Sequence, residues 1–347
     1  METSDVNNLK NPSLGQALEE FNDDLMPAGF LSDVDIQNLL DNDIVICNYD
    51  EDNLTDIGYN LTSTDFIFSI NNGLLVEIQH NENEKFCYIE PHDTVLVITR
   101  ESIWVSDKIS GTFHSKVKMV SAGFGHVSTT LDPFWEGPLV ISINNPTNKK
   151  LKFLIEKDKK DGKGFKHCSF VTLIFYKMVT AAKKAHDNKS CRLDILKDIV
   201  EKPNDKDKNY YKYDELDKTI SSIAELDFVK TSVKELRNPL KRKVGIETFK
   251  KKGNEFDRQI NDYIQQANSV TKTIRNTKVK KKKMINRVAT IISMIFFVIP
   301  IGIIIYIAVK NQDNSSVTLG QTLSLFSSIY LSLVPQVVKY SYLRKEK

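Results

Sequence analysis

The segment EKFCYIEPHDTVLVITRESIWVSDKISG, residues 84–111, consists of short apolar or alternating runs that are interrupted by turn-forming residues such as EPHD. Runs of the same kind recur from about Phe66 to Met178, and turn-forming stretches such as NNG, DPFWEG, NNPTN and KKDGKG separate them. Many short strands at such a spacing are typical of an all-β barrel or sandwich. We therefore predict a mostly β domain in this part of the chain.

One clear helix is expected before these strands, and it begins in LSDVDIQNLL, residues 31–40. Ser32 is a preferred N-cap residue, and Asp35 follows three positions later. A serine and an acidic residue at this spacing form a capping box, in which each side chain binds the backbone N–H of the other residue. The sequence thus predicts where the helix starts.

Five stretches share their order and spacing with the motifs of a known family. They are LSDVDIQNLLDNDIVI (31–46), DIGYNLTST (56–64), the quoted segment, LDPFWEGPLVISINNPTNKKLKF (131–153) and HCSFVTLIFYKM (167–178). Together they resemble the family that includes dCTP deaminases and trimeric dUTPases. The resemblance implies a dUTPase-like distorted barrel over residues 30–178. It also implies a homotrimer with nucleotide sites between subunits.

The family's catalytic stretch, G-R-S-S-[LF]-A-R-x-G, aligns with HSKVKM, residues 114–119. Ser115 matches a motif serine, whereas the two arginines fall on His114 and Met119 and the second serine falls on Lys116. Arginine supplies a bidentate fork that histidine and lysine do not reproduce. Lys116 and Lys118 nevertheless keep positive charge where the resemblance places phosphate.

The two activities of the family depend on different carboxylates. In the deaminases the resemblance places the general base, a glutamate, at Ser142, and a serine without a partner cannot move that proton at neutral pH. In the dUTPases an aspartate activates water, and Asp132 stands at its position. Asp132 also precedes a proline, where aspartate is common for conformational reasons. Catalysis, if present, is therefore expected to use Asp132 and Ser115.

Further nucleotide contacts are expected from residues near these motifs. Asn60 replaces the family's metal-associated aspartate, and the resemblance implies Mg²⁺ as a companion of the nucleotide. Tyr59 precedes Asn60 in its motif, and Gly123 lies in SAGFGHV, where a glycine permits close approach of the backbone to a base. The predicted nucleotide site thus comprises Tyr59, Asn60, His114, Ser115, Lys116, Lys118, Gly123, Asp132 and Trp135.

A basic helical segment follows the β domain and a helical linker of residues 181–240. Its apolar positions step by three and four residues, as in a coiled coil. They are Ile246, Phe249, Gly253, Phe256, Ile260, Tyr263, Ala267, Val270 and Ile274. Two interpretations remain open: the seam mediates self-association, or the helix lies on the protein's own core. Gly253 interrupts the seam and is a candidate hinge.

Two long uncharged runs near the C-terminus, Val288–Val309 and Val317–Val338, suggest a membrane hairpin. The first is long enough to cross a hydrocarbon core as a helix. Lysines and arginines flank the pair on its outer sides, so the positive-inside rule predicts cytoplasmic termini at the cell membrane. The basic run Lys278–Arg287 is then expected to contact anionic lipid headgroups rather than nucleic acid.

The cysteines do not indicate a metal site. The chain has four of them among 347 residues, Cys47, Cys87, Cys168 and Cys191, and no two have the short spacing of zinc ligands. We expect reduced thiols and no zinc or other protein-bound metal. The chain is accordingly divided as follows: polar segment 1–27, β domain 28–180, linker 181–240, stalk 241–287, transmembrane helices 288–309 and 317–338, and basic tail 339–347.

These features favour a membrane-tethered, dUTPase-like pseudoenzyme that binds a nucleotide or nucleotide-derived signal and relays its occupancy to the hairpin. A bacterial defence effector would fit this architecture. The first alternative is an active dCTP deaminase or dUTP diphosphatase. The second is a scaffold whose barrel binds only protein.

Overall fold

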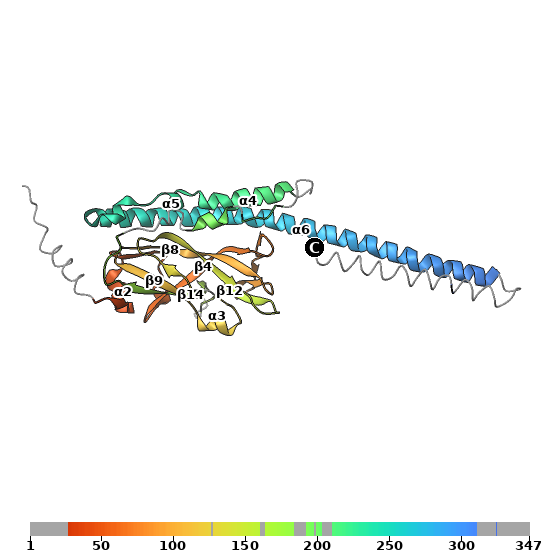
Figure 1. Ribbon diagram of the computed structural model, residues 1–347, viewed down its shortest axis with the longest axis horizontal. Helices are drawn as coiled ribbons and strands as arrows, with labels where there is room; N and C mark the ends of the chain where they lie inside the picture. The colour runs from red at the N-terminus through yellow and green to blue at the C-terminus, as the bar shows by residue number, and fades with distance from the viewer. Residues whose placement is uncertain are drawn as a thin grey trace, which may run out of the picture. The chain divides into compact units, whose positions relative to one another are not determined.

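The computed structural model describes residues 27–125, 128–159, 164–183, 192–197, 199–202 and 210–310, together with Ser324. The chain divides into two compact units, Met1–Ile274 and Arg275–Lys347. The first unit contains a β barrel and, alongside it, a helical layer (Figure 1). The predicted tail 339–347 and all but the last residue of the segment 1–27 lie outside the described residues.

The barrel is built from two antiparallel sheets, as the mostly β prediction required. The path of the larger sheet is β10 (Thr130–Leu131), β9 (Ile109–Ser115), β14 (Ser169–Lys177), β4 (Gly58–Ser69), β8 (Thr94–Val105) and β11 (Glu136–Asn144). Short strands at its margins are β1 (Gly29–Phe30), β2 (Ile44–Cys47), β3 (Leu54–Thr55) and β5 (Leu74–Leu75). The smaller sheet runs β13 (Phe165–His167), β12 (Leu151–Asp158), β7 (Glu84–Ile89) and β6 (Gln79–His80).

The α-helices are α2 (Asp33–Leu39), α3 (Val117–Ser121), α4 (Tyr210–Ala224), α5 (Asp227–Lys230) and α6 (Arg242–Lys310). Short 3₁₀ helices are η1 (Glu51–Asn53), η2 (Leu193–Leu196), η3 (Lys234–Arg237) and η4 (Pro239–Lys241). The capping box of α2 is confirmed, because the Ser32 N–H donates to Asp35 Oδ2 at 2.9 Å and the Asp35 N–H donates to Ser32 Oγ at 3.2 Å.

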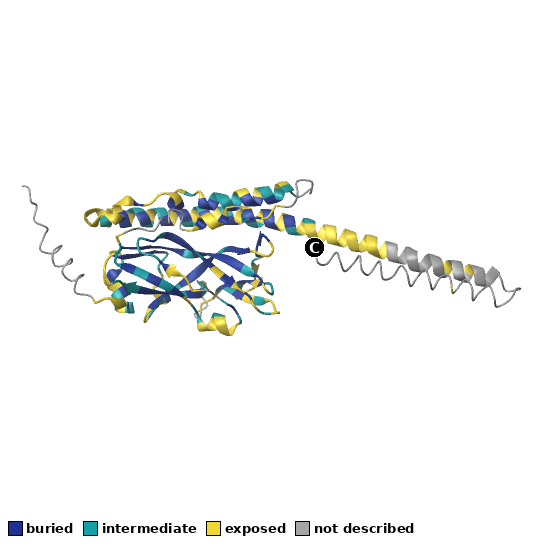
Figure 2. Ribbon diagram, viewed as in Figure 1, coloured by how far each residue is buried: buried dark blue, intermediate teal, exposed yellow. Residues whose placement is uncertain are grey.

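Strand β8 contains two apolar runs, VLVI (residues 95–98) and IWV (residues 103–105). Val95, Val97 and Ile103 face the interior of the barrel, whereas Leu96 and Trp104 belong to a second core between the sheet and the helices. Both faces of the strand are therefore buried, as Figure 2 shows for the strands beside the helical layer. A strand covered on both faces has no polar side to alternate with its apolar side.

The apolar seam of the stalk is buried in the core between the helical layer and the barrel. Phe249, Phe256 and Ile260 are buried in the same core as Trp104 of the barrel. Of the two interpretations of the seam, the packing within one chain corresponds to the second, a helix on the protein's own core. Gly253 is a point of close approach, since an added Cβ would lie 2.5 Å from Cys47 Sγ.

The predicted membrane hairpin is contradicted. A span needs about 20 predominantly apolar residues in one helix. Across the described ranges, no helix is both long enough and apolar enough to cross a membrane. This corrects the prediction of a two-span protein at the cell membrane with cytoplasmic termini, and the described residues offer no support for a lipid contact at Lys278–Arg287. Apart from Ser324, the run Val317–Val338 lies outside those residues.

Candidate functional site

The stretch aligned with the family's catalytic motif lies where strand β9 passes into α3. Phe113 is buried in the barrel core and His114 is exposed, as the alternation of a strand requires. Lys116 precedes α3 in an extended conformation, at the N-cap position. The change from strand to helix therefore brings Ser115, Lys116 and Met119 to one edge of the barrel.

Lys116 meets the GYNL motif at this edge. Its Nζ donates to Oδ1 of Asn60 at 2.6 Å, and the Thr172 hydroxyl donates to the same oxygen at 2.8 Å. The pairing of β14 with β4 and β9 explains this, because Thr172 lies opposite both Asn60 and His114. Burial, and then the charge of Lys118, lower the pKa of Lys116 from its usual value. The positive charge is thus held among neutral partners at a site that disfavours it.

A second set of polar contacts lies on the same face of the sheet, along β9 and β14. Nε2 of His114 lies 2.9 Å from Oγ1 of Thr112, which in turn contacts the hydroxyl of Tyr176. The ring of Tyr176 packs against Phe30 with 4.9 Å between the centroids. His114 therefore joins a network on the outer face of β9 and β14, next to the contact between Lys116 and Asn60.

A small apolar pocket lies at the margin of the barrel core, next to the point where β9 passes into α3. It is lined by Ser115, Met119, Phe124, Gly125, Ile141, Ile143, Phe170 and Val171. Its 10 Å³ has room for about one water molecule. The lining contains no acidic or basic side chain, and Met119 is part of the wall where the resemblance places an arginine. The pocket of a single chain therefore offers no general acid or base.

The turn that carries Asp132 is stabilised by its own backbone. The Asp132 carbonyl accepts from the Trp135 N–H at 3.1 Å, and its Oδ1 accepts from the Thr130 hydroxyl at 3.2 Å. These bonds agree with a conformational role for the aspartate. Trp135 is buried, and its Nε1 donates to the Gly137 carbonyl at 3.1 Å. The structure therefore places Trp135 in the core and not at the pocket.

Two other predicted contacts lie away from the pocket lining. Tyr59 is fully buried, and its hydroxyl accepts from the Asp50 N–H at 2.9 Å. Burial raises the pKa of this phenol far above its usual value. Gly123 has φ +102°, a left-handed conformation that favours glycine. Its neighbour Gly125 is the one that lines the pocket, where its backbone pairs with Asn144 at 2.9 and 3.0 Å.

The family's deaminase position is on the outside of the barrel. Ile141 and Ile143 of β11 face the core, so the intervening Ser142 is exposed. Mg²⁺ does not fit the position of Asn60, because its side-chain oxygen already accepts from an ammonium and a hydroxyl group. Within the described ranges, no three His, Cys, Asp or Glu side chains are grouped as metal ligands.

Glu101 is a notable residue to which the sequence reasoning assigned no role. Its side chain is fully buried and accepts from the backbone N–H of Thr62 at 2.9 Å and from the Thr62 hydroxyl at 2.6 Å. Burial raises the pKa of its carboxyl group to about 7, although both hydrogen bonds act in the opposite direction. The available signal was a glutamate within a predicted strand, in the polar stretch TRES that separates the apolar runs VLVI and IWV.

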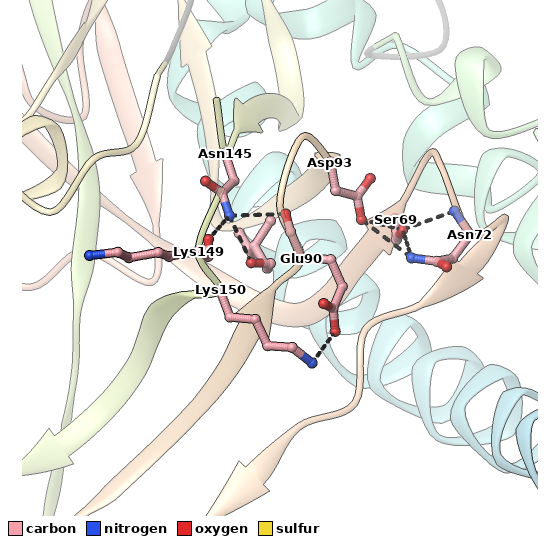
Figure 3. Close-up of polar contacts among 8 residues, drawn as sticks. Ser69, Asn72, Glu90, Asp93, Asn145, Lys149 and Lys150 are labelled. Carbon is pink, nitrogen blue, oxygen red and sulfur yellow. Dashed lines mark hydrogen bonds and ion pairs between the residues drawn. The ribbon is translucent and has the colours of Figure 1, made fainter. Parts of the chain in front are cut away.

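Two other motif residues, Asp93 and Asn145, have structural roles in a polar network (Figure 3). Asp93 is buried and accepts from the Ser69 hydroxyl at 2.5 Å, while its backbone carbonyl accepts from the Asn145 N–H at 2.8 Å. The Asn145 side chain donates to the carbonyls of Ile89, Glu90 and Lys149. The network joins three loops at one end of the barrel. It therefore contributes to the fold and is separate from the pocket.

Part of the chain is similar to a known protein family and to solved structures. Residues 30–160 match the family model described as dCTP deaminase-like. A comparison with curated proteins gave no match. The chain is similar to the 2′-deoxycytidine 5′-triphosphate deaminase of Agrobacterium tumefaciens, with 11% identity and a TM-score of 0.33 over 44% of this chain. It spans about half of that protein, or 49%.

Two solved dUTPases are similar over smaller parts of this chain. The EIAV dUTPase has 16% identity and a TM-score of 0.23, over 37% of this chain and 95% of its own. A variant dUTPase of Staphylococcus bacteriophage 80alpha with dUpNHpp has 14% identity and a TM-score of 0.26, over 42% of this chain and 97% of its own. The resemblance of the β domain to this family is supported by the family model, which matches residues 30–160.

Proposed function

We propose that the barrel binds a pyrimidine deoxynucleotide at the edge formed by Asn60, Ser115 and Lys116, without deaminating it. The observation that carries this proposal is the half-buried ammonium group of Lys116, whose partner is the neutral amide oxygen of Asn60. A phosphate placed beside this group would favour its charged form. The match of residues 30–160 to the dCTP deaminase-like model supports a nucleotide as the source of that phosphate.

We infer the absence of deamination from the residues that line the pocket and occupy the catalytic positions of the family. The lining offers no carboxylate, and Ser142 stands where the resemblance requires a glutamate. Asp132 is engaged in its turn. The family resemblance further suggests a trimer, in which a second chain would complete each site. Size-exclusion chromatography with light scattering would measure this assembly.

The test uses the full chain with dCTP, dUTP and dTTP, each with and without Mg²⁺. Binding is followed by calorimetry, and products are followed by ion-exchange chromatography. We expect saturable binding, no conversion of dCTP to dUTP, and no release of diphosphate. Lys116→Met should weaken binding about tenfold or more, as for the loss of a hydrogen bond to a charged group. Lys149→Met is the matched control, since Lys149 is exposed and lies on the network of Figure 3.

The outcomes separate the alternatives. Product formation that disappears in Asp132→Ala would replace the proposal with a diphosphatase. Product formation that persists in that variant while dCTP is consumed would indicate a deaminase. No binding of any nucleotide would contradict the proposal and favour the protein-binding scaffold.

A further inference from the structure

The turn that carries Asp132 is contacted from outside the barrel by the segment Ser232–Arg242, which we call the latch segment. It includes η3 and η4 and leads into α6. Glu136, directly after the turn, accepts from the Val233 N–H at 2.7 Å and from the Ser232 hydroxyl at 2.5 Å. Both oxygens of this largely buried carboxylate are therefore used by the latch segment.

Phe134 provides a second contact at the centre of the turn. Its φ is +63°, in the left-handed region that favours glycine, and the family consensus at this position is glycine. The ring does not line the pocket. Instead the guanidinium of Arg237 lies 5.6 Å from its centroid. A phenylalanine in a strained conformation is thus stabilised by a residue of the latch segment.

The far end of the latch segment is attached to Asp43, which directly precedes β2, and to Trp104 of β8. Nη1 of Arg242 donates to Oδ1 of Asp43 at 3.0 Å, and its guanidinium lies 5.7 Å from the ring of Trp104. Trp104 in turn pairs with Glu136 across β8 and β11. The backbone continues the connection, because the Ser106 N–H donates to the Asp43 carbonyl at 2.9 Å and the Phe134 N–H donates to the Ser106 carbonyl at 3.3 Å.

The contacts with the turn are separable from the packing of the latch segment itself. Val233 and Leu236 are buried in the core between sheet and helices. Ser232 and Arg237, in contrast, are exposed residues whose side chains reach Glu136 and Phe134. The apolar residues thus anchor the segment, and the polar residues contact the turn and the residue after it.

From these contacts we infer that the latch segment sets the conformation of the Asp132 turn, so that the turn rearranges only when the segment lifts from the barrel. Any ligand or partner that moves the start of α6 would then change the conformation of the turn. A ligand that binds at the turn would shift the position of α6 by the same coupling free energy. This regulation goes beyond nucleotide binding and does not depend on it.

Hydrogen exchange measured by mass spectrometry on the full chain tests the inference without a ligand. In Ser232→Ala/Arg237→Ala, the amides of residues 134–137 should exchange about tenfold faster, as for the loss of a hydrogen bond to a charged group. Lys218→Ala is the matched control, because it removes an ion pair with Asp214 within α4, elsewhere in the helical layer. Faster exchange confined to the latch segment, with an unchanged turn, would overturn the inference.

Phe134→Gly tests the coupling from the other side and remains informative if the double variant loses stability throughout. The glycine accepts the left-handed backbone but removes the ring that contacts Arg237. We expect faster exchange in residues 232–238 of this variant. Faster exchange in the turn alone would mean that the two segments are not coupled.

Discussion

Two outer faces of the same barrel have opposite characters. On β8, Leu96, Ile98 and Trp104 point out of the barrel and are buried by the helical layer. On β9 and β14, Thr112, His114 and Thr172 point outward and stay half-buried or exposed. The covered face has become a second core of the domain, whereas the open face holds the polar contacts of the candidate site.

This difference shows where binding by the barrel is expected. A ligand that replaces water must find polar groups on an accessible face, and in the described part of the barrel such groups gather along β9, β14 and the start of β4. The helical layer contributes only indirectly, through the latch segment at the turn. Each of the following predictions tests some part of this contrast between the covered and the open face.

The largest effect is expected on the covered face. Phe249 is fully buried and its ring lies 5.2 Å from that of Phe228, so Phe249→Ala should lower the free energy of unfolding by about 3–5 kcal/mol. Leu240→Ala is the control, since Leu240 is 92% exposed and its loss should cost less than about 0.5 kcal/mol. Urea denaturation measures both. Equal effects of the two substitutions would show that the helices do not share a core with the barrel.

The stability of the protein is expected to depend on pH through Glu101, which is fully buried in β8. Burial raises its carboxyl pKa to about 7 in the folded protein from the 4.5 of an unperturbed glutamate, so the folded state holds this proton more tightly than the unfolded state. Stability is therefore greatest below pH 4.5 for this group and decreases as the pH rises through 7, by about 3 kcal/mol in total.

Glu101→Gln isolates this contribution. The amide can accept from the Thr62 N–H and donate to the Thr62 hydroxyl, so the hydrogen bonds of the buried side chain can be retained. Denaturation between pH 5 and pH 8 should show a smaller decrease in stability for the variant than for the parent protein. The same slope in both proteins would assign the pH dependence to other groups.

A smaller effect is expected where α6 approaches β2. Gly253→Ala places a methyl group against Cys47 Sγ, and overpacking of this kind costs about 1–3 kcal/mol, of which better helix propensity offsets about 1 kcal/mol. Cys47→Ala removes the sulfur, so the double variant should be more stable than the sum of the single effects predicts. Thermal denaturation of the four proteins measures this coupling. Strict additivity would contradict the close approach.

The smallest change in stability is expected on the open face. Lys116→Met removes a half-buried charge and one hydrogen bond to Asn60, and these opposing effects should leave the free energy of unfolding within about 0.5–1 kcal/mol of the parent value. Urea denaturation provides the measurement. A loss as large as that of Phe249→Ala would assign Lys116 to the fold and not to a binding site.

Sequence patterns were sufficient to predict much of the barrel and part of the candidate site. The short runs after Phe66 are strands, and Ser32 and Asp35 form the capping box. Asn60 and Lys116, chosen from separate motifs, are in direct contact. Tyr59 and Trp135 are buried and do not line the pocket, because a motif position does not show which face of a strand its side chain occupies once bulges and turns intervene; their contact with a nucleotide stays a prediction.

The sequence by itself determined which positions are apolar, where the first helix starts and which family the β domain resembles. Only the tertiary structure decided what covers the apolar seam of α6, why Gly253 interrupts it and how the latch segment meets the Asp132 turn. The physical reason is that the hydrophobic effect has no direction: an apolar stripe requires burial, but another helix, a second chain or the barrel satisfies it equally well. The partner is selected by shape, which emerges only when distant strands and helices are packed together.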